Sequence, residues 1–321
     1  MLKTTMTAML GIEHPIVQGG MGLISKAELV AAVSNAGALG LLTSVASTPE
    51  ELRQEIRKTR TLTDKPFGIN FPLTPAAGNS QALIEAALEE GIRIVETSGS
   101  SPEPYMKLLK DNGVKVIHKT PAIRFARKAE SVGVDAVAML GQGAGGHIGF
   151  DMVSSMVLVP AAADALGIPV LAAGEIADAR GLVAALALGA DGIMMGTRFM
   201  LTQEAPVHPA VKQWLAEAKE TDTVVVEKSI RNPARVMVGE GAYRILGMES
   251  QHAKIEELMP IIISGFKEVK ETGNSAAGIF YSGQAMGLVH SIPTVKELID
   301  SIMSQADSIA RRLGALGVSS S

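Results

Sequence analysis

A short unit recurs along the first two thirds of the sequence: a helical stretch ends in glycine, and a β-branched apolar run follows it at once. The copies lie at residues 36–42, 90–96, 112–118, 132–137, 166–171 and 188–193, with a looser one at 65–70. A glycine directly after a helix adopts the left-handed conformation that closes the last turn, so each copy predicts a helix end and a strand start. With a further apolar run at 14–18, the pattern predicts eight strands, each followed by a helix.

The predicted strands are apolar throughout instead of alternating, which is typical of parallel strands covered on both faces. Eight βα units favour an α/β fold of the closed (β/α)8 TIM barrel type. The alternative is an open doubly wound sheet. However, the run at 18–22 does not form the G-x-G-x-x-G fingerprint, and no acidic residue closes the next strand. We therefore predict the barrel.

The period breaks after the eighth predicted strand. The segment of about 202–289 contains a helix-like stretch at 209–219 and a Val/Thr run at 221–226. We predict that it forms a cap or lid domain inserted into a barrel made of residues 1–201 and about 290–314. The amphipathic stretch at 293–313 is expected to supply the eighth barrel helix.

Composition excludes several function classes. The chain has no cysteine, which removes disulfides, thiolate metal sites and a cysteine nucleophile, and no histidine pair has the spacing of a metal site. A net charge of −4 and few aromatic residues argue against nucleic-acid binding. No apolar run is long enough to span a bilayer and no signal-peptide pattern opens the chain, so we expect a cytoplasmic protein without membrane contact. Low charge and an apolar cap favour a homodimer.

Polar and glycine-rich residues gather where the predicted strands end, which is the active face of a (β/α)8 barrel. They lie at 18–21, 70, 96–99, 118–120, 141–149, 172–175 and 196–198. The loops after the seventh and eighth strands commonly bind a phosphate through backbone N–H groups. Gly174-Glu175 and Gly196-Thr197 offer such groups, and Lys119 would supply a cation. The alternative is that these glycines only turn the chain into the next helices.

The run Gly143-Ala144-Gly145-Gly146-His147 predicts a functional histidine. The glycines expose the backbone and direct an imidazole across the barrel mouth. Histidine exchanges its proton near neutral pH and therefore suits general base catalysis. The alternative is a loop histidine held by backbone hydrogen bonds. No Ser–His–Asp arrangement is legible, so the sequence offers a hydrolase no nucleophile.

Several of these runs together resemble the nitronate monooxygenase family, formerly called 2-nitropropane dioxygenases. They lie at 14–21, 65–70, 145–149, 195–199 and 282–284. Similar patterns occur in flavin-dependent NAD(P)H:quinone reductases and in enoyl-acyl-carrier-protein reductase II. The resemblance implies a TIM barrel that holds FMN without a covalent bond and oxidises alkyl nitronates or nitroalkanes with O2 to carbonyl compounds and nitrite. His147 matches the catalytic histidine, which would abstract the acidic α-proton or position the nitronate.

The resemblance also implies the cofactor-binding residues. Those expected to line the flavin or hydrogen-bond to it are Gln18, Gly19, Gly20, Met21, Asn70, Lys119, Gly145 and Gly146. Those expected to hold the 5′-phosphate are Gly174, Glu175, Gly196 and Thr197, with Ser282 and Gln284 closing the site from the cap.

Two positions depart from the family pattern. Relatives often have glycine where Glu175 stands and an acidic residue where Gly143 stands. A carboxylate facing a phosphate would repel it, so we predict that the Glu175 side chain points away while its N–H still donates.

Two other functions stay open on the sequence. The first is an NAD(P)H-dependent FMN reductase of quinones or enoyl thioesters. The second is a barrel without flavin that binds a phosphate ligand, such as an isomerase, an aldolase or a binding protein. A Schiff-base aldolase would need Lys119 in an apolar pocket, and polar neighbours argue against that.

Overall fold

Eight parallel strands close into a barrel in the computed structural model, which describes residues 2–73, 79–275 and 278–316. The predicted (β/α)8 fold is confirmed, because β9 pairs back with β1 and closes the ring. The barrel strands are β1 (Ile16–Gln18), β2 (Leu39–Thr43), β3 (Phe67–Leu73), β4 (Ile94–Gly99), β5 (Lys115–Thr120), β6 (Ala136–Leu140), β8 (Val170–Ala173) and β9 (Gly192–Met195).

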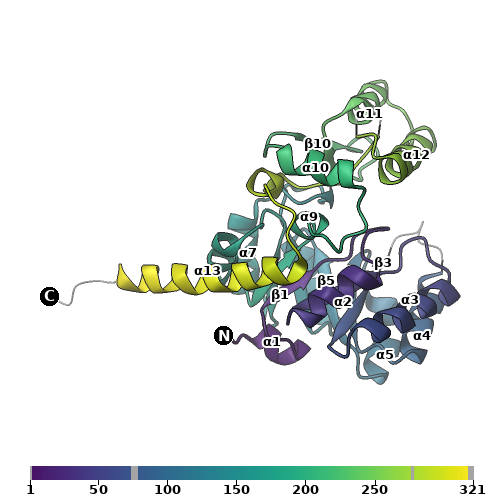
Figure 1. Ribbon diagram of the computed structural model, residues 1–321. Helices are drawn as coiled ribbons and strands as arrows, with labels where there is room; N and C mark the ends of the chain where they lie inside the picture. Colours follow the sequence, from purple (N-terminus) through teal and green to yellow (C-terminus); the bar gives the residue numbers. More distant parts are fainter. Residues whose placement is uncertain (1, 74–78, 276–277, 317–321) are drawn as a thin grey trace.

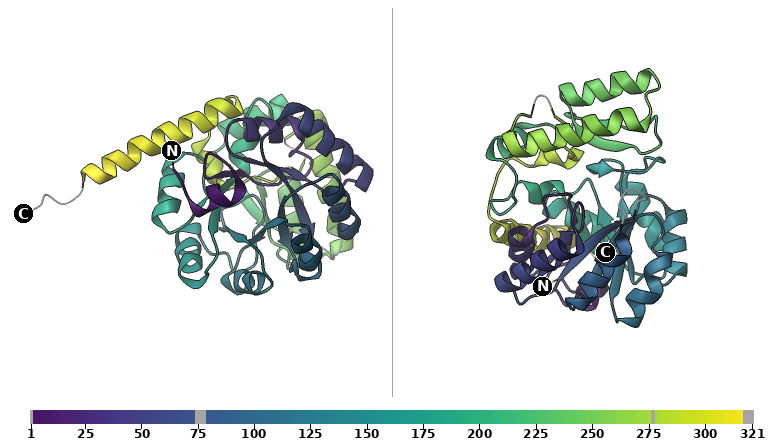
Figure 2. Two further views of the ribbon diagram at one scale, coloured as in Figure 1. Left: turned by 90° about the horizontal axis from the view of Figure 1, so that it is seen from below. Right: turned by 90° about the vertical axis from the view of Figure 1, so that its right-hand side faces the viewer.

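A ring of helices surrounds the barrel strands. They are α2 (Ala27–Asn35), α3 (Pro49–Leu62), α4 (Ser80–Glu89), α5 (Glu103–Asp111), α6 (Ile123–Ser131), α7 (Ser155–Ala165) and α8 (Ala179–Ala187). The last helix, α13 (Val295–Ala315), packs against α8 and α2 and so takes the eighth place, as the sequence predicts. Its C-terminal part extends beyond the barrel (Figure 2). The short α1 (Thr5–Leu10) contributes Met6 and Leu10 to the apolar cluster inside the barrel.

The glycines that follow the helices adopt the expected left-handed conformation, with one exception. Positive φ angles occur at Gly37, Gly91, Gly113, Gly133 and Gly189. The prediction is wrong at Gly167, because Leu166 is already extended and takes the chain out of α7 without a left-handed residue. The Gly167 N–H donates instead to Glu130 Oε1, at 2.7 Å.

The segment after α9 (Thr197–Met200) covers the end of the barrel at which the strands finish (Figure 1). Its elements are α10 (Pro209–Glu217), β10 (Thr223–Val226), β11 (Ala234–Met237), α11 (Glu240–Ser250), α12 (Ile255–Thr272) and the 3-10 helix η2 (Gln284–Leu288). β11 lies between β10 and the two-residue β7 (Gly146–His147) in a small antiparallel sheet. That residues 202–289 form a domain of their own stays a prediction.

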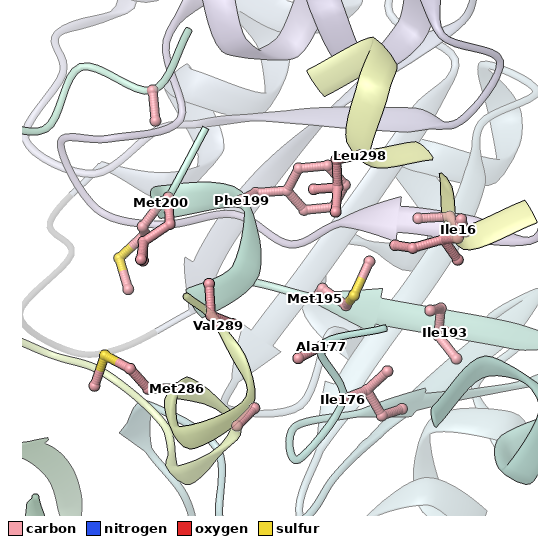
Figure 3. Packing of buried hydrophobic residues seen from close by; sticks show 14 of the residues in the cluster. Ile16, Ile176, Ala177, Ile193, Met195, Phe199, Met200, Met286, Val289 and Leu298 are labelled. Atoms are coloured by element: carbon pink, nitrogen blue, oxygen red, sulfur yellow. The ribbon is translucent and has the colours of Figure 1, made fainter. Parts of the chain in front are cut away.

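One apolar cluster ties the returning end of this segment to the barrel. Met286 and Val289 lie in the same cluster as Met195, the last residue of β9, and Phe199 of α9 (Figure 3). Both Met286 and Phe199 are fully buried. The chain that precedes α13 is therefore anchored to the barrel by packing as well as by connectivity.

In the described part of the chain, every helix is too short or too polar to cross a membrane. A single chain does not test the homodimer, which stays a prediction.

Candidate active site

His147 lies on β7, one strand of the small antiparallel sheet that the loop after β6 forms with the cap segment, residues 202–289. The loop after β6 leads into β7, where Gly146 and His147 pair with Arg235 and Ala234 of β11. The nearly buried Arg235 guanidinium donates twice to the carbonyl oxygen of Gln142, at 3.1 and 3.0 Å, and this fixes the start of the loop. The imidazole itself stays 53% exposed. A histidine held by its backbone with a free ring is suited to proton transfer.

The ends of β8 and β9 present backbone N–H groups without a protein acceptor. Among the residues that the structure describes, none of the N–H groups of Gly174, Glu175, Gly196 and Thr197 donates a hydrogen bond. The two strands are neighbours in the barrel, so these groups belong to one region of its rim. Unpaired N–H groups in this arrangement suit an anion such as a phosphate.

Both carboxylate oxygens of Glu175 are used by the neighbouring loop. Oε1 accepts the N–H of Gly143 and Oε2 accepts the N–H of Ser155 at the start of α7, each at 2.8 Å. The backbone of Glu175 has a φ of +64°, a conformation that favours glycine. The side chain therefore faces the loop after β6. That the Glu175 N–H donates to a phosphate stays a prediction.

The segment 282–284 lies directly on the loop that carries His147. The N–H of Gln284 donates to the carbonyl oxygen of Gly143 at 2.8 Å, and the N–H of Gly283 donates to Thr197 Oγ1 at 3.0 Å. A side chain at Gly145 would place its Cβ 2.7 Å from the backbone of Ser282, so only glycine permits this approach. The structure thus brings together predicted site residues that lie far apart in the sequence.

A charged network lies inside the barrel mouth. Lys119 Nζ is 2.9 Å from Oε1 of Glu96, and Asn70 Nδ2 donates to Oε2 of the same carboxylate at 2.7 Å. Glu96 is completely buried and Lys119 is 18% exposed. The cation of Lys119 is thus balanced by a carboxylate that the predicted site omits. Glu96 lies within β4, and an acidic residue directly after the apolar start of a strand was the available signal.

The glycine-rich loop after β1 lies beside the same network. Gly20 is so close to Asn70 that an added Cβ would lie 2.3 Å from the Asn70 Cβ, whereas Met21 lies near Gly196. The Gln18 side chain is fully buried and donates to Gly19 and Ser25. Its carbonyl oxygen accepts the N–H of Leu41, so this side chain holds the loop in place. Direct contact between Gln18 and a cofactor stays a prediction.

These residues fit the chemistry of FMN, which joins a phosphate to a planar ring with polar edges. The unpaired N–H groups suit the phosphate, and Asn70 and Lys119 offer polar groups at the mouth. A Cβ added to Gly146 would meet no described atom within 4 Å, so the space beside the imidazole-bearing strand is open. A separate cavity of about 460 Å³ lies at the other end of the barrel, lined by residues such as Arg60, Lys65 and Arg93.

The chain is similar to known proteins over nearly its whole length. The sequence model of a family described as nitronate monooxygenase matches residues 3–305. The (3aS,4S,5R,7aS)-5-hydroxy-7a-methyl-1-oxo-octahydro-1H-indene-4-carboxyl-CoA dehydrogenase of Rhodococcus jostii is 37% identical, over 98% of this chain and 99% of that protein. A probable nitronate monooxygenase of Staphylococcus saprophyticus is 30% identical, over 97% and 99%. The solved structure of FabK from Thermotoga maritima gives a TM-score of 0.94 at 37% identity, over 99% of this chain and 100% of that one.

Proposed function

This chain belongs to the nitronate monooxygenase family, and from that premise we propose that it is an FMN-dependent oxidoreductase with His147 as its acid–base group. One observation carries the proposal. The unpaired N–H groups at the ends of β8 and β9 lie at the same barrel mouth as the loop that presents the imidazole. Membership of an oxidoreductase family also disfavours the isomerase, aldolase or binding protein that the sequence alone left open.

Different residues at the barrel mouth would bind different parts of the cofactor. The four N–H groups would bind the phosphate. The Thr197 hydroxyl would add a donor, because its oxygen accepts from Gly283 and its proton has no acceptor among the described residues. Asn70 and Lys119 would meet the polar edge of the ring. The residues that would line it are Gly19, Gly20, Met21, Gly145, Gly146, Ser282 and Gln284. FMN supplies the acceptance and release of electrons when bound, and the chain supplies orientation and proton handling.

For the substrate, a thioester of coenzyme A is the first candidate. The relatives at 35–37% identity are named as carboxyl-CoA dehydrogenases, and they cover nearly all of this chain. A nitronate or nitroalkane is the second candidate, favoured by the family description and by the relative at 30% identity. The nitro or thioester group acidifies the neighbouring C–H, and His147 would exchange that proton. Reduction of an enoyl thioester or a quinone would require NAD(P)H as electron donor.

Binding of FMN is the first test. We expect the purified protein to carry FMN or to take it up, with visible absorption bands and a rise in melting temperature on addition of FMN. Protein that stays colourless and gains no thermal stability with FMN would contradict the proposal.

Two assays on the loaded protein separate the substrate classes. Rapid anaerobic bleaching by NADH or NADPH, followed by reoxidation with an enoyl-CoA, supports the thioester. Oxygen uptake with nitrite release from ethyl nitronate supports the monooxygenase. His147→Asn should lower the rate with a neutral nitroalkane by about 10²-fold or more, because the proton then has no base to accept it. A nitronate has already lost that proton, so its oxidation should be affected less.

A further inference from the structure

A buried carboxylate from the cap faces His147. Glu227 directly follows β10, and its side chain is only 1% exposed. Its Oε2 lies 3.5 Å from Nε2 of His147. The backbone of Glu227 has a φ of +63°, a conformation that costs free energy for a residue with a side chain. The fold thus keeps Glu227 in an unfavourable backbone conformation at the position where its carboxylate faces the imidazole.

Among the described residues, the other contacts of Glu227 are neutral donors, and none of them is a cation. Asn232 Nδ2 donates to Oε2 at 2.8 Å. Tyr281 lies near both groups, with its ring centroid 5.8 Å from that of His147. Burial, together with the charge of the Glu227 carboxylate and a hydrogen bond to it, raises the pKa of Tyr281, so its phenol stays neutral. A buried carboxylate is stable only beside a donor or a cation, and the imidazole is a group that can become one.

The cationic neighbour on β11 is directed elsewhere. Arg235 pairs by its backbone with Gly146, yet its guanidinium donates to Gln142 and to Thr223. Glu227 therefore supplies the charge next to the His147 ring, from the loop between β10 and β11.

We propose that Glu227 is a positioning residue for His147, which keeps the proton of the neutral imidazole on Nε2 and stabilises the imidazolium. In a neutral histidine, an acceptor beside one ring nitrogen keeps the proton on that nitrogen and leaves the other nitrogen basic. With Nε2–H facing Glu227, Nδ1 is the basic nitrogen that takes the substrate proton. The imidazolium that results lies beside a negative charge. The catalytic part of this inference rests on the proposed function, whereas the position of the ring proton does not.

Glu227→Gln tests the inference, because it removes the charge and nearly keeps the shape. The measurement is the ring nitrogen shifts of the neutral histidines by NMR, with His147 assigned through His147→Asn. In the parent protein these shifts should report the proton on Nε2, the nitrogen that lies 3.5 Å from Glu227 Oε2. In Glu227→Gln we expect His147 to lose this preference for Nε2–H, because an amide can donate as well as accept.

Glu249→Gln is the matched control. The Glu249 carboxylate accepts the N–H groups of Glu227 and Ser229, so its replacement disturbs the same loop without removing a charge beside the ring. A purely structural role would make both variants alike. We expect His147 to keep its proton on Nε2 in Glu249→Gln.

A parent imidazole with its proton on Nδ1, or a folded Glu227→Gln that keeps the same preference for Nε2–H, would overturn the inference. Should Glu227→Gln not fold, Glu227→Asp withdraws the carboxylate by one methylene and should weaken the preference for Nε2–H, and an unchanged preference would be equally damaging. A chain that binds no FMN yet shows the expected ring nitrogen shifts would refute the proposed function and leave the pairing of Glu227 with His147 intact.

Discussion

The side chain of Glu175 fills the space that a side chain at residue 143 would need. A Cβ added to Gly143 would lie 2.5 Å from Glu175 Cγ and 2.8 Å from its Oε1, the oxygen that accepts the Gly143 N–H. The sequence analysis expects departures from the family pattern at the same two positions, 143 and 175. In the structure these positions share one space, which a carboxylate from the loop after β8 occupies.

An acidic residue at 143 should be tolerated better when Glu175 is removed. We expect Gly143→Glu alone to lower the free energy of unfolding by about 2 kcal/mol, because it overpacks the contacts with Glu175 and with Gln284 Oε1. Adding Glu175→Gly removes the nearer of these side chains and suits the positive φ there, and the Gln284 amide is the end of a flexible side chain that can move. The double variant should be more stable than the sum of the single effects by about 1 kcal/mol or more, measured by urea unfolding. Strictly additive effects would show that the two residues do not share this space.

The hydroxyl of Thr197 should matter to cofactor affinity more than its methyl group. Thr197→Val removes the acceptor of the Gly283 N–H and the proposed donor to the phosphate. We expect the affinity for FMN to fall about tenfold, the usual effect of one lost hydrogen bond to a charged group. Thr197→Ser keeps the hydroxyl and is the control. Fluorescence titration of the apoprotein with FMN measures both, and equal affinities of the two variants would count against the contact.

Removing only the cation of the Lys119–Glu96 ion pair should lower the stability of the fold. Lys119→Met leaves the buried Glu96 carboxylate without its cation, and we expect a loss of about 3 kcal/mol in the free energy of unfolding. Adding Glu96→Gln removes the uncompensated charge and should restore most of that loss. Urea unfolding of the single and double variants checks this. A double variant less stable than Lys119→Met would contradict it.

Acid should destabilise the fold through His118. Burial, with the neighbouring Lys119 cation, lowers the pKa of this histidine to about 4, and its Nδ1 lies 2.9 Å from Thr97 Oγ1. The unfolded chain binds a proton at this residue below about pH 6.5, whereas the folded chain does so only near pH 4. Stability should therefore be complete above pH 6.5 and fall as the pH drops toward 4, by about 3 kcal/mol in total.

Unfolding experiments between pH 7.5 and 4.5 measure this dependence. His118→Asn should flatten it, whereas replacing the exposed His290 should not. Some slope should remain, because burial also lowers the pKa of His14. An unaltered slope in His118→Asn would contradict the assignment.

The fold was readable from the sequence because each βα unit repeats the same local signals. The glycine turns and apolar runs mark strand starts independently of one another, and eight such units leave few alternatives to a closed ring. The positions of the active-face loops could be predicted for the same reason, because locating a strand in the sequence also locates the loop that follows it. Gly167 shows the limit of the glycine rule, because a helix can also end by passing directly into extended chain.

The partners of the predicted site residues were not readable. Glu96 lies on a strand among apolar residues, and its role depends on Lys119 reaching it from the next strand. Glu227 lies 80 positions after His147 in the sequence and meets it only because β11 pairs with β7. No local pattern encodes such a contact, since it arises from the register between two distant segments.

The pairing of β7 with β11 also limits how this architecture can change. A cap joined only by its two chain connections could be exchanged between relatives as a unit. Here the cap contributes β11, the strand that pairs with the strand of His147. A chimera that replaced residues 202–289 would therefore also change the surroundings of that histidine. New specificities in such a molecule are more accessible through single side-chain replacements within the existing cap than through recombination of whole segments.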